Sequence, residues 1–74
     1  MSDTIAIDCL GMRCPRPIIE IAKAARRCEP GTRISIRSDD LAFESDVKAW
    51  IESAHATLLE LVCDGREVHA VISL

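Results

Sequence analysis

The chain has 74 residues, of which 49% are hydrophobic, with three glycines and three prolines. This is enough for one small core and leaves no room for a second, so we expect a single domain over residues 1–74. Nine basic and twelve acidic residues give a net charge of -3, and the aromatic side chains are one tryptophan and one phenylalanine. Such a chain offers neither a positive field for phosphates nor a platform for stacked bases, so we expect no direct binding to nucleic acid.

The sequence also argues against membrane insertion and secretion. No apolar run approaches the roughly 18 residues of a membrane span, and the acidic start MSDTIAID lacks the basic segment of a secretory signal. We therefore expect no membrane contact and a cytoplasmic location. In a reducing compartment the four cysteines are core thiols, metal ligands or reactive thiols rather than a disulfide framework.

A strand and a helix are predicted in the first part of the chain. Residues 4–9 alternate apolar and polar side chains with the period of two that is typical of a strand. Over about residues 15–28 the apolar side chains instead recur at the three- and four-residue spacing of an amphipathic helix. Pro30 and Gly31 should stop this helix.

The same order is predicted once more in the middle of the chain. Residues 33–38 alternate as a second strand, and residues 42–55 show helical spacing again. Asp39 and Asp40 stand before this second helix, where we expect them to cap it.

The last part of the chain predicts a hairpin. Residues 57–63 and 67–74 are rich in branched apolar side chains and are joined by Asp64-Gly65, a strong signal for a tight turn between antiparallel strands. The order is then β-α-β-α-β-β. Because strand–helix–strand crossovers are right-handed and leave their strands parallel, the fold class should be an α/β two-layer sandwich, with both helices on one face of a four-stranded mixed sheet. Polar alternates should occupy the other face; they are Asp8, Arg33, Ser35, Arg37, Glu60, His69 and Ser73.

The turn between the first strand and the first helix holds the residues that could carry chemistry. Cys14 precedes Pro15, and proline suits the first helical position because its missing N–H would be unpaired there. We therefore expect Cys14 at the N-cap, Pro15 at N1 and Pro17 at N3. The N–H of Arg16 is then the one first-turn donor aimed at the Cys14 sulfur.

Positive charge around Cys14 should activate its thiol. The positive end of the helix dipole favours an anion, and Arg13 and Arg16 add two cationic side chains. We therefore expect the pKa of Cys14 to fall below its usual value of about 8.5, which makes the exposed thiolate a nucleophile.

The other cysteines are expected to be structural. Cys9 shares the alternation of the first strand and should face the core, although a turn at Gly11 could bring it near Cys14 as a second thiol. Cys28 and Cys63 should also be core residues. We expect no metal, because the sequence lacks the closely spaced cysteine or histidine pairs of structural zinc sites. No phosphate-binding glycine loop, catalytic triad or carboxylate pair is visible, so hydrolysis and nucleotide chemistry lack residues to carry them. We also expect no cofactor.

The pattern D-x-x-G-x-x-C-P-x-P, from Asp8 through Gly11 and Cys14 to Pro17, resembles the signature of the TusA (SirA-like) sulfur-carrier family. Other landmarks of that family have counterparts here: the Pro30-Gly31 turn, the Asp39-Asp40 pair, Trp50 and the Asp64-Gly65 hairpin. The resemblance covers nearly the whole chain and implies a sandwich with strand order 1-2-4-3.

The resemblance also implies a function. Family members hold sulfur as a persulfide on the cysteine that matches Cys14, receive it from a cysteine desulfurase or a rhodanese-like protein, and relay it to tRNA thiolation, molybdenum-cofactor or sulfur-oxidation pathways. Residues of the same turn would support the thiol: Asp8, Gly11, Arg13, Pro15, Arg16 and Pro17. Arg16 stands where the tRNA-thiolation carriers tend to have an acid, which would change the partner surfaces.

Two functions are therefore open. One is a sulfur carrier or sulfurtransferase that uses Cys14 between a protein donor and a protein acceptor. The other is a thiol redox or regulatory binding module in which Cys14 and Cys9 close a reversible disulfide. A carrier needs Cys14 alone and gains the mass of a sulfur atom, whereas a switch needs both thiols and loses two hydrogens on oxidation.

Overall fold

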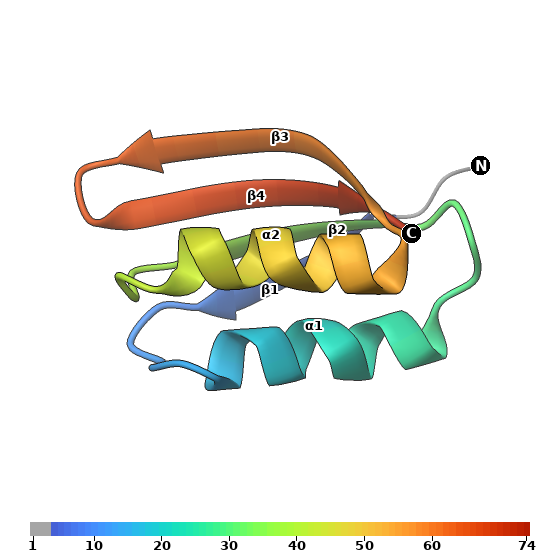
Figure 1. The fold of residues 1–74 in the computed structure, drawn as a ribbon, viewed down its shortest axis with the longest axis horizontal. Helices are drawn as coiled ribbons and strands as arrows, with labels where there is room; N and C mark the ends of the chain where they lie inside the picture. The colour runs from blue at the N-terminus through green and yellow to red at the C-terminus, as the bar shows by residue number, and fades with distance from the viewer. Residues whose placement is uncertain (1–3) are drawn as a thin grey trace.

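The computed structural model describes residues 4–74, which form two helices and four strands (Figure 1). In chain order the elements are β1 (Thr4–Cys9), α1 (Arg16–Arg27), β2 (Arg33–Ser38), α2 (Phe43–Ala54), β3 (Thr57–Asp64) and β4 (Glu67–Ser73). The predicted order β-α-β-α-β-β is confirmed. Neither helix is long and apolar enough to cross a membrane.

The strands form one mixed sheet with the order β1-β2-β4-β3. β1 runs parallel to β2, and β4 is antiparallel to both of its neighbours, β2 and β3. Both helices lie on the same face of this sheet (Figure 1), which confirms the two-layer sandwich and the strand order. Because β1 and β2 are parallel, the loops that follow them leave the sheet at the same end, next to the C-terminal ends of both strands. The candidate site lies at that end.

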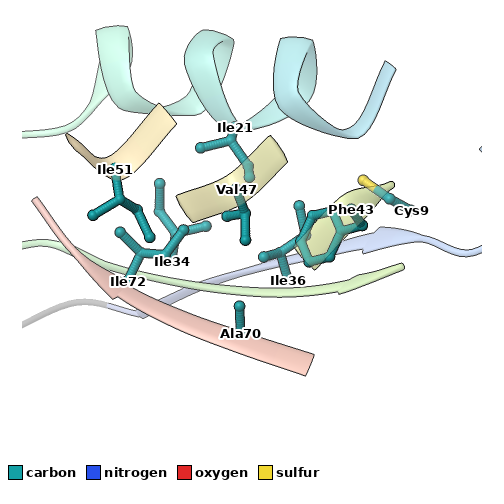
Figure 2. Packing of buried hydrophobic residues seen from close by; sticks show 9 residues of the cluster. All are labelled: Cys9, Ile21, Ile34, Ile36, Phe43, Val47, Ile51, Ala70 and Ile72. Carbon is teal, nitrogen blue, oxygen red and sulfur yellow. The ribbon is translucent and has the colours of Figure 1, made fainter. Parts of the chain in front are cut away.

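The core lies between the sheet and the two helices, as Figure 2 shows. Its members are the inward side chains of the strands and the sheet-facing side chains of the helices: Cys9, Ile21, Ile34, Ile36, Phe43, Val47, Ile51, Ala70 and Ile72. The alternation of β1 explains the position of Cys9, which is 0% exposed. The prediction that Cys9 faces the core is confirmed.

The opposite face of the sheet carries predicted polar side chains, together with Val62 and Val71, which pair with residues of this face. On this face Ser35 Oγ and His69 Nε2 lie 2.6 Å apart and share a hydrogen bond, and Arg37 Nη2 donates to Glu67 Oε1 at 2.8 Å. These contacts join β2 to β4 across the sheet. In the described part of the chain no other element covers this face, because both helices lie on the opposite one.

Strand β3 departs from the predicted pattern. Its pairing with β4 shifts between Leu58 and Glu60, and the intervening Leu59 is 48% exposed. Because a bulge changes which residues face inward, Leu59 does not share a buried face with Leu61. The prediction that Cys63 is a core residue is wrong, since Cys63 is exposed near the end of an edge strand.

Candidate functional site

The loop between β1 and α1 begins with a turn that is fixed by hydrogen bonds among its own residues. Asp8 Oδ1 accepts a hydrogen bond from the N–H of Leu10 at 3.0 Å, and the N–H of Met12 donates to the carbonyl of Cys9 at 3.1 Å. Gly11 has a φ of 83°, in the left-handed region that favours glycine. The sequence pattern around Asp8 and Gly11 therefore encodes a defined turn.

The loop between β2 and α2 holds this turn in place. Asp39 Oδ1 accepts a hydrogen bond from the N–H of Gly11 at 2.9 Å, and Asp40 Oδ2 accepts one from the N–H of Cys14 at 3.1 Å. The prediction that these aspartates cap α2 is wrong, because its N-cap is Ala42 and no side chain caps it. The sequence signal that was missed is topological: loops after adjacent parallel strands meet at one edge of the sheet.

The thiol of Cys14 is exposed and donates a hydrogen bond to Asp46 Oδ2 at 2.8 Å. Asp46 lies near the start of α2, 32 residues further along the chain. This hydrogen bond raises the pKa of Cys14, and desolvation and the charges of Asp46 and Asp40 act in the same direction. The predicted lowering of this pKa is wrong, because a carboxylate that accepts the thiol proton stabilises the neutral form.

Helix α1 begins one residue later than predicted. Pro15 is the N-cap, Arg16 is N1 and Pro17 is N2, and no side chain caps the helix. The N–H of Arg16 donates to the carbonyl of Arg13 at 2.8 Å. The prediction that Cys14 is the N-cap and receives this N–H is therefore wrong, since the loop backbone takes the donor that was assigned to the sulfur.

The two arginines do not surround the thiol with positive charge. Arg13 Nη1 lies 3.5 Å from Asp39 Oδ1, so this guanidinium is paired with a carboxylate. The side chain of Arg16 is exposed and forms no ion pair within residues 4–74. The charges that act on the pKa of Cys14 are those of Asp46 and Asp40.

A groove of about 380 Å³ opens beside Cys14 between the two helices. Its lining residues come from the end of the loop before α1, from the first turn of α1 and from one side of α2: Cys14, Pro15, Ile18, Asp46, Ala49, Trp50 and Ser53. The members from α2 recur at the three- and four-residue spacing that places side chains on one helix face. This spacing is the sequence signal that links Asp46 and Trp50 to one helix face, and neither residue was among the predicted site residues.

The other three thiols lie apart from this arrangement. All four cysteines are free, and burial raises the pKa of Cys9, which lies in the core. Cys28 is half-buried at the end of α1. Cys63 is exposed and donates to Glu44 Oε1 at 3.4 Å, a hydrogen bond that raises its pKa. Cys14 is thus the one cysteine that lies in the groove.

Three potential ligand atoms meet at the site. The Cys14 sulfur and one carboxylate oxygen each from Asp40 and Asp46 lie within 4.8 Å of one another. A cation could touch all three, but both carboxylates already accept hydrogen bonds from Cys14, and exposed acidic groups commonly gather without an ion. We assign no metal to this cluster, and the absence of a metal and of a cofactor stays a prediction.

Comparison with known proteins gives consistent matches. Residues 5–74 match the family model described as sulfurtransferase TusA. A protein of Archaeoglobus fulgidus assigned as a sulfur carrier is 37% identical over 54 residues, which cover 73% of this chain and 70% of that protein. The YrkI protein of Bacillus subtilis, also assigned as a sulfur carrier, is 31% identical over 88% of this chain and 87% of its own length. The crystal structure of a SirA-like protein from Desulfitobacterium hafniense superposes with a TM-score of 0.80 at 27% identity, over 93% of this chain and 95% of that one.

Proposed function

The chain belongs to the TusA family of sulfur carriers, and from this premise we propose that it carries sulfur as a persulfide on Cys14. The observation that carries the proposal is the placement of Cys14. Its thiol is exposed, while the N–H of the same residue is anchored to Asp40. A nucleophile that must meet the sulfur of another protein needs both exposure and a fixed position.

The reaction requires one thiol and no redox partner. The Cys14 thiolate attacks the outer sulfur of a donor persulfide, the donor S–S bond breaks, and the donor leaves as a thiolate. Cys14 then holds S–SH. Delivery repeats the exchange, with the acceptor thiolate attacking the outer sulfur and Cys14 leaving as a thiolate. The sulfur atom keeps its oxidation state in both steps, so the domain needs no cofactor for them.

The position of Cys9 favours the carrier over the redox module. A disulfide switch would require Cys9 to reach Cys14, yet Cys9 is 0% exposed and belongs to the core. We propose a cysteine desulfurase or a rhodanese-like protein as donor. The acceptor would belong to tRNA thiolation, molybdenum-cofactor synthesis or sulfur oxidation, as for other sulfur carriers of this kind.

Intact-mass analysis tests the proposal. The protein is incubated with a cysteine desulfurase and cysteine, and we expect a gain of about 32 Da, one sulfur atom, that a reductant removes. Cys14→Ser should gain nothing. Cys63→Ser is the matched control, because it removes the other clearly exposed thiol and should still be loaded. Sulfur retained on a folded Cys14→Ser protein would refute the proposal.

A further inference from the structure

The two carboxylates at Cys14 are unusual for a thiol that must become a nucleophile. Asp46 accepts a hydrogen bond from its sulfur and Asp40 accepts one from its N–H, and both side chains are half-buried. Neither carboxylate forms an ion pair within residues 4–74. The nearby guanidinium of Arg13 is paired with Asp39 instead. The charges that act on the sulfur are therefore those of two carboxylates that form no ion pair among the described residues.

This negative charge affects sulfur donors differently according to their own charge. A small anion that reacts at the sulfur must come within several ångströms of both carboxylates. Two unit charges about 6 Å away, in water and at moderate salt, disfavour a singly charged anion about three- to tenfold. A neutral reagent or a positively charged surface does not meet this barrier.

The groove shows what can compensate the charge. Asp46 and the ring of Trp50 line it together with the apolar side chains of Ile18 and Ala49. An arginine or lysine side chain combines an apolar stem with a cationic head. It can therefore lie against Ile18 and Ala49, contact the face of Trp50 and pair with Asp46.

We propose that Asp46, assisted by Asp40, is a positioning and specificity-determining residue that keeps anionic small-molecule sulfur compounds away from Cys14. It releases the thiol for reaction when a protein donor places a cationic side chain in the groove. This inference rests on the proposed carrier function. When the cation pairs with Asp46, the hydrogen bond to the thiol breaks and the thiol proton passes to solvent. The Cys14 thiolate then attacks the outer sulfur of the donor persulfide, and the donor thiolate leaves.

The first test compares two alkylating reagents that differ in charge, neutral iodoacetamide and anionic iodoacetate. Both react with the same thiolate, so the ratio of their rates at Cys14 does not depend on the thiolate fraction. Rates are measured at low salt by mass spectrometry of the Cys14 and Cys63 peptides. In Asp46→Asn the preference of Cys14 for the neutral reagent should fall about two- to fivefold, and Asp46→Glu should restore it.

Glu44→Gln is the matched control. It removes one negative charge from the same end of α2, but Glu44 contacts Cys63 and is paired with Lys48. The preference at Cys14 should therefore stay within about 1.5-fold of the original value. Asp40→Asn is a second variant that keeps the test valid if Asp46→Asn does not fold, and it should shift the ratio in the same direction as Asp46→Asn. An unchanged ratio in the folded aspartate variants would overturn the inference.

The second test follows sulfur itself. A tetrasulfide dianion can load Cys14 by giving up its terminal sulfur and leaving as trisulfide dianion. We expect Asp46→Asn to load about three- to tenfold faster than the original protein from tetrasulfide, and more slowly from a cysteine desulfurase with cysteine. Equal or faster loading from the desulfurase would overturn the role of a cationic donor side chain. If neither donor loads Cys14 while the alkylation ratio still shifts, the proposed carrier function fails and the charge selectivity of Asp46 stands.

Discussion

Two aspartates anchor the Cys14 loop, and their separate contributions can be distinguished by experiment. Asp40→Ala removes the acceptor of the Cys14 N–H, and Asp39→Ala removes the acceptor of the Gly11 N–H. We expect each substitution to free its own amide and to leave the other protected. The prediction matters for function because a carrier thiol on a mobile loop would lose the fixed position that transfer requires.

The size of the effect follows from the hydrogen bond that is lost. A hydrogen bond to a charged group contributes about 1.5–3 kcal/mol when it is buried. The bond from Cys14 to Asp40 is exposed, so solvent reduces its contribution to about 0.5–1.5 kcal/mol. Because a tenfold change in an equilibrium corresponds to about 1.4 kcal/mol, local opening at Cys14 should increase about two- to tenfold.

Amide hydrogen exchange measured by NMR is the assay. In Asp40→Ala the N–H of Cys14 should exchange about two- to tenfold faster, while the N–H of Gly11 changes by less than about twofold. The pattern should reverse in Asp39→Ala. Equal acceleration at both amides in either variant would mean that the loop opens as one unit, and the reasoning from separate anchors would then be wrong.

Four further predictions concern the thiol and the core. Cys9→Ser should be loaded with sulfur normally, but its free energy of unfolding should fall by about 1–3 kcal/mol in denaturant titrations, because a hydroxyl replaces a buried thiol; loss of loading in the folded variant would revive the two-thiol switch. Asp46→Asn should move the pH profile of iodoacetamide labelling at Cys14 to lower pH, since the hydrogen bond that raises the pKa is weakened and more thiolate exists near neutral pH; an unmoved profile would contradict this cause. Val47→Ala deletes two fully buried methyl groups and should lower Tm by about 8–16 °C in a calorimetric scan; an unchanged Tm would contradict the close packing of this side chain. Arg16→Ala should change the labelling rate of Cys14 by less than about twofold, because the exposed guanidinium of Arg16 is screened by salt. A larger loss of rate would show that this arginine does activate the thiol.

The fold was predictable because each element has a local signal. Alternation identified β1 and β2, helical spacing identified α1 and α2, and Asp64-Gly65 identified the hairpin of β3 and β4. The bulge around Leu59 was not predicted, because a run of branched apolar residues has no local sign of a register shift. Sequence periodicity therefore located the strand but not the register shift within it.

The reactivity of Cys14 was harder to predict than its exposure. The local sequence offers a helix start and two arginines, and both suggest a lowered pKa. The group that sets the direction of the pKa shift is Asp46, which is 32 residues away in sequence. It reaches the thiol because α2 packs beside α1. A local reading also assigned Asp39 and Asp40 to α2, whereas the meeting of two loops at one sheet edge assigns them to Cys14.

The raised pKa of Cys14 restrains both the loading and the delivery of sulfur until the charge of Asp46 is neutralised. In thiol exchange, a thiol of higher pKa is a poorer leaving group, although its thiolate is intrinsically more nucleophilic. The hydrogen bond to Asp46 keeps the thiol of free Cys14 protonated, so less thiolate is present to attack a donor persulfide. In the proposed carrier, the same carboxylates would also repel the small anionic thiolates that strip sulfur from a loaded Cys14. A partner that neutralises Asp46 removes both restraints, since the thiolate then forms more readily and leaves more readily. One contact between α2 and the Cys14 loop can thus confine both transfers to protein complexes.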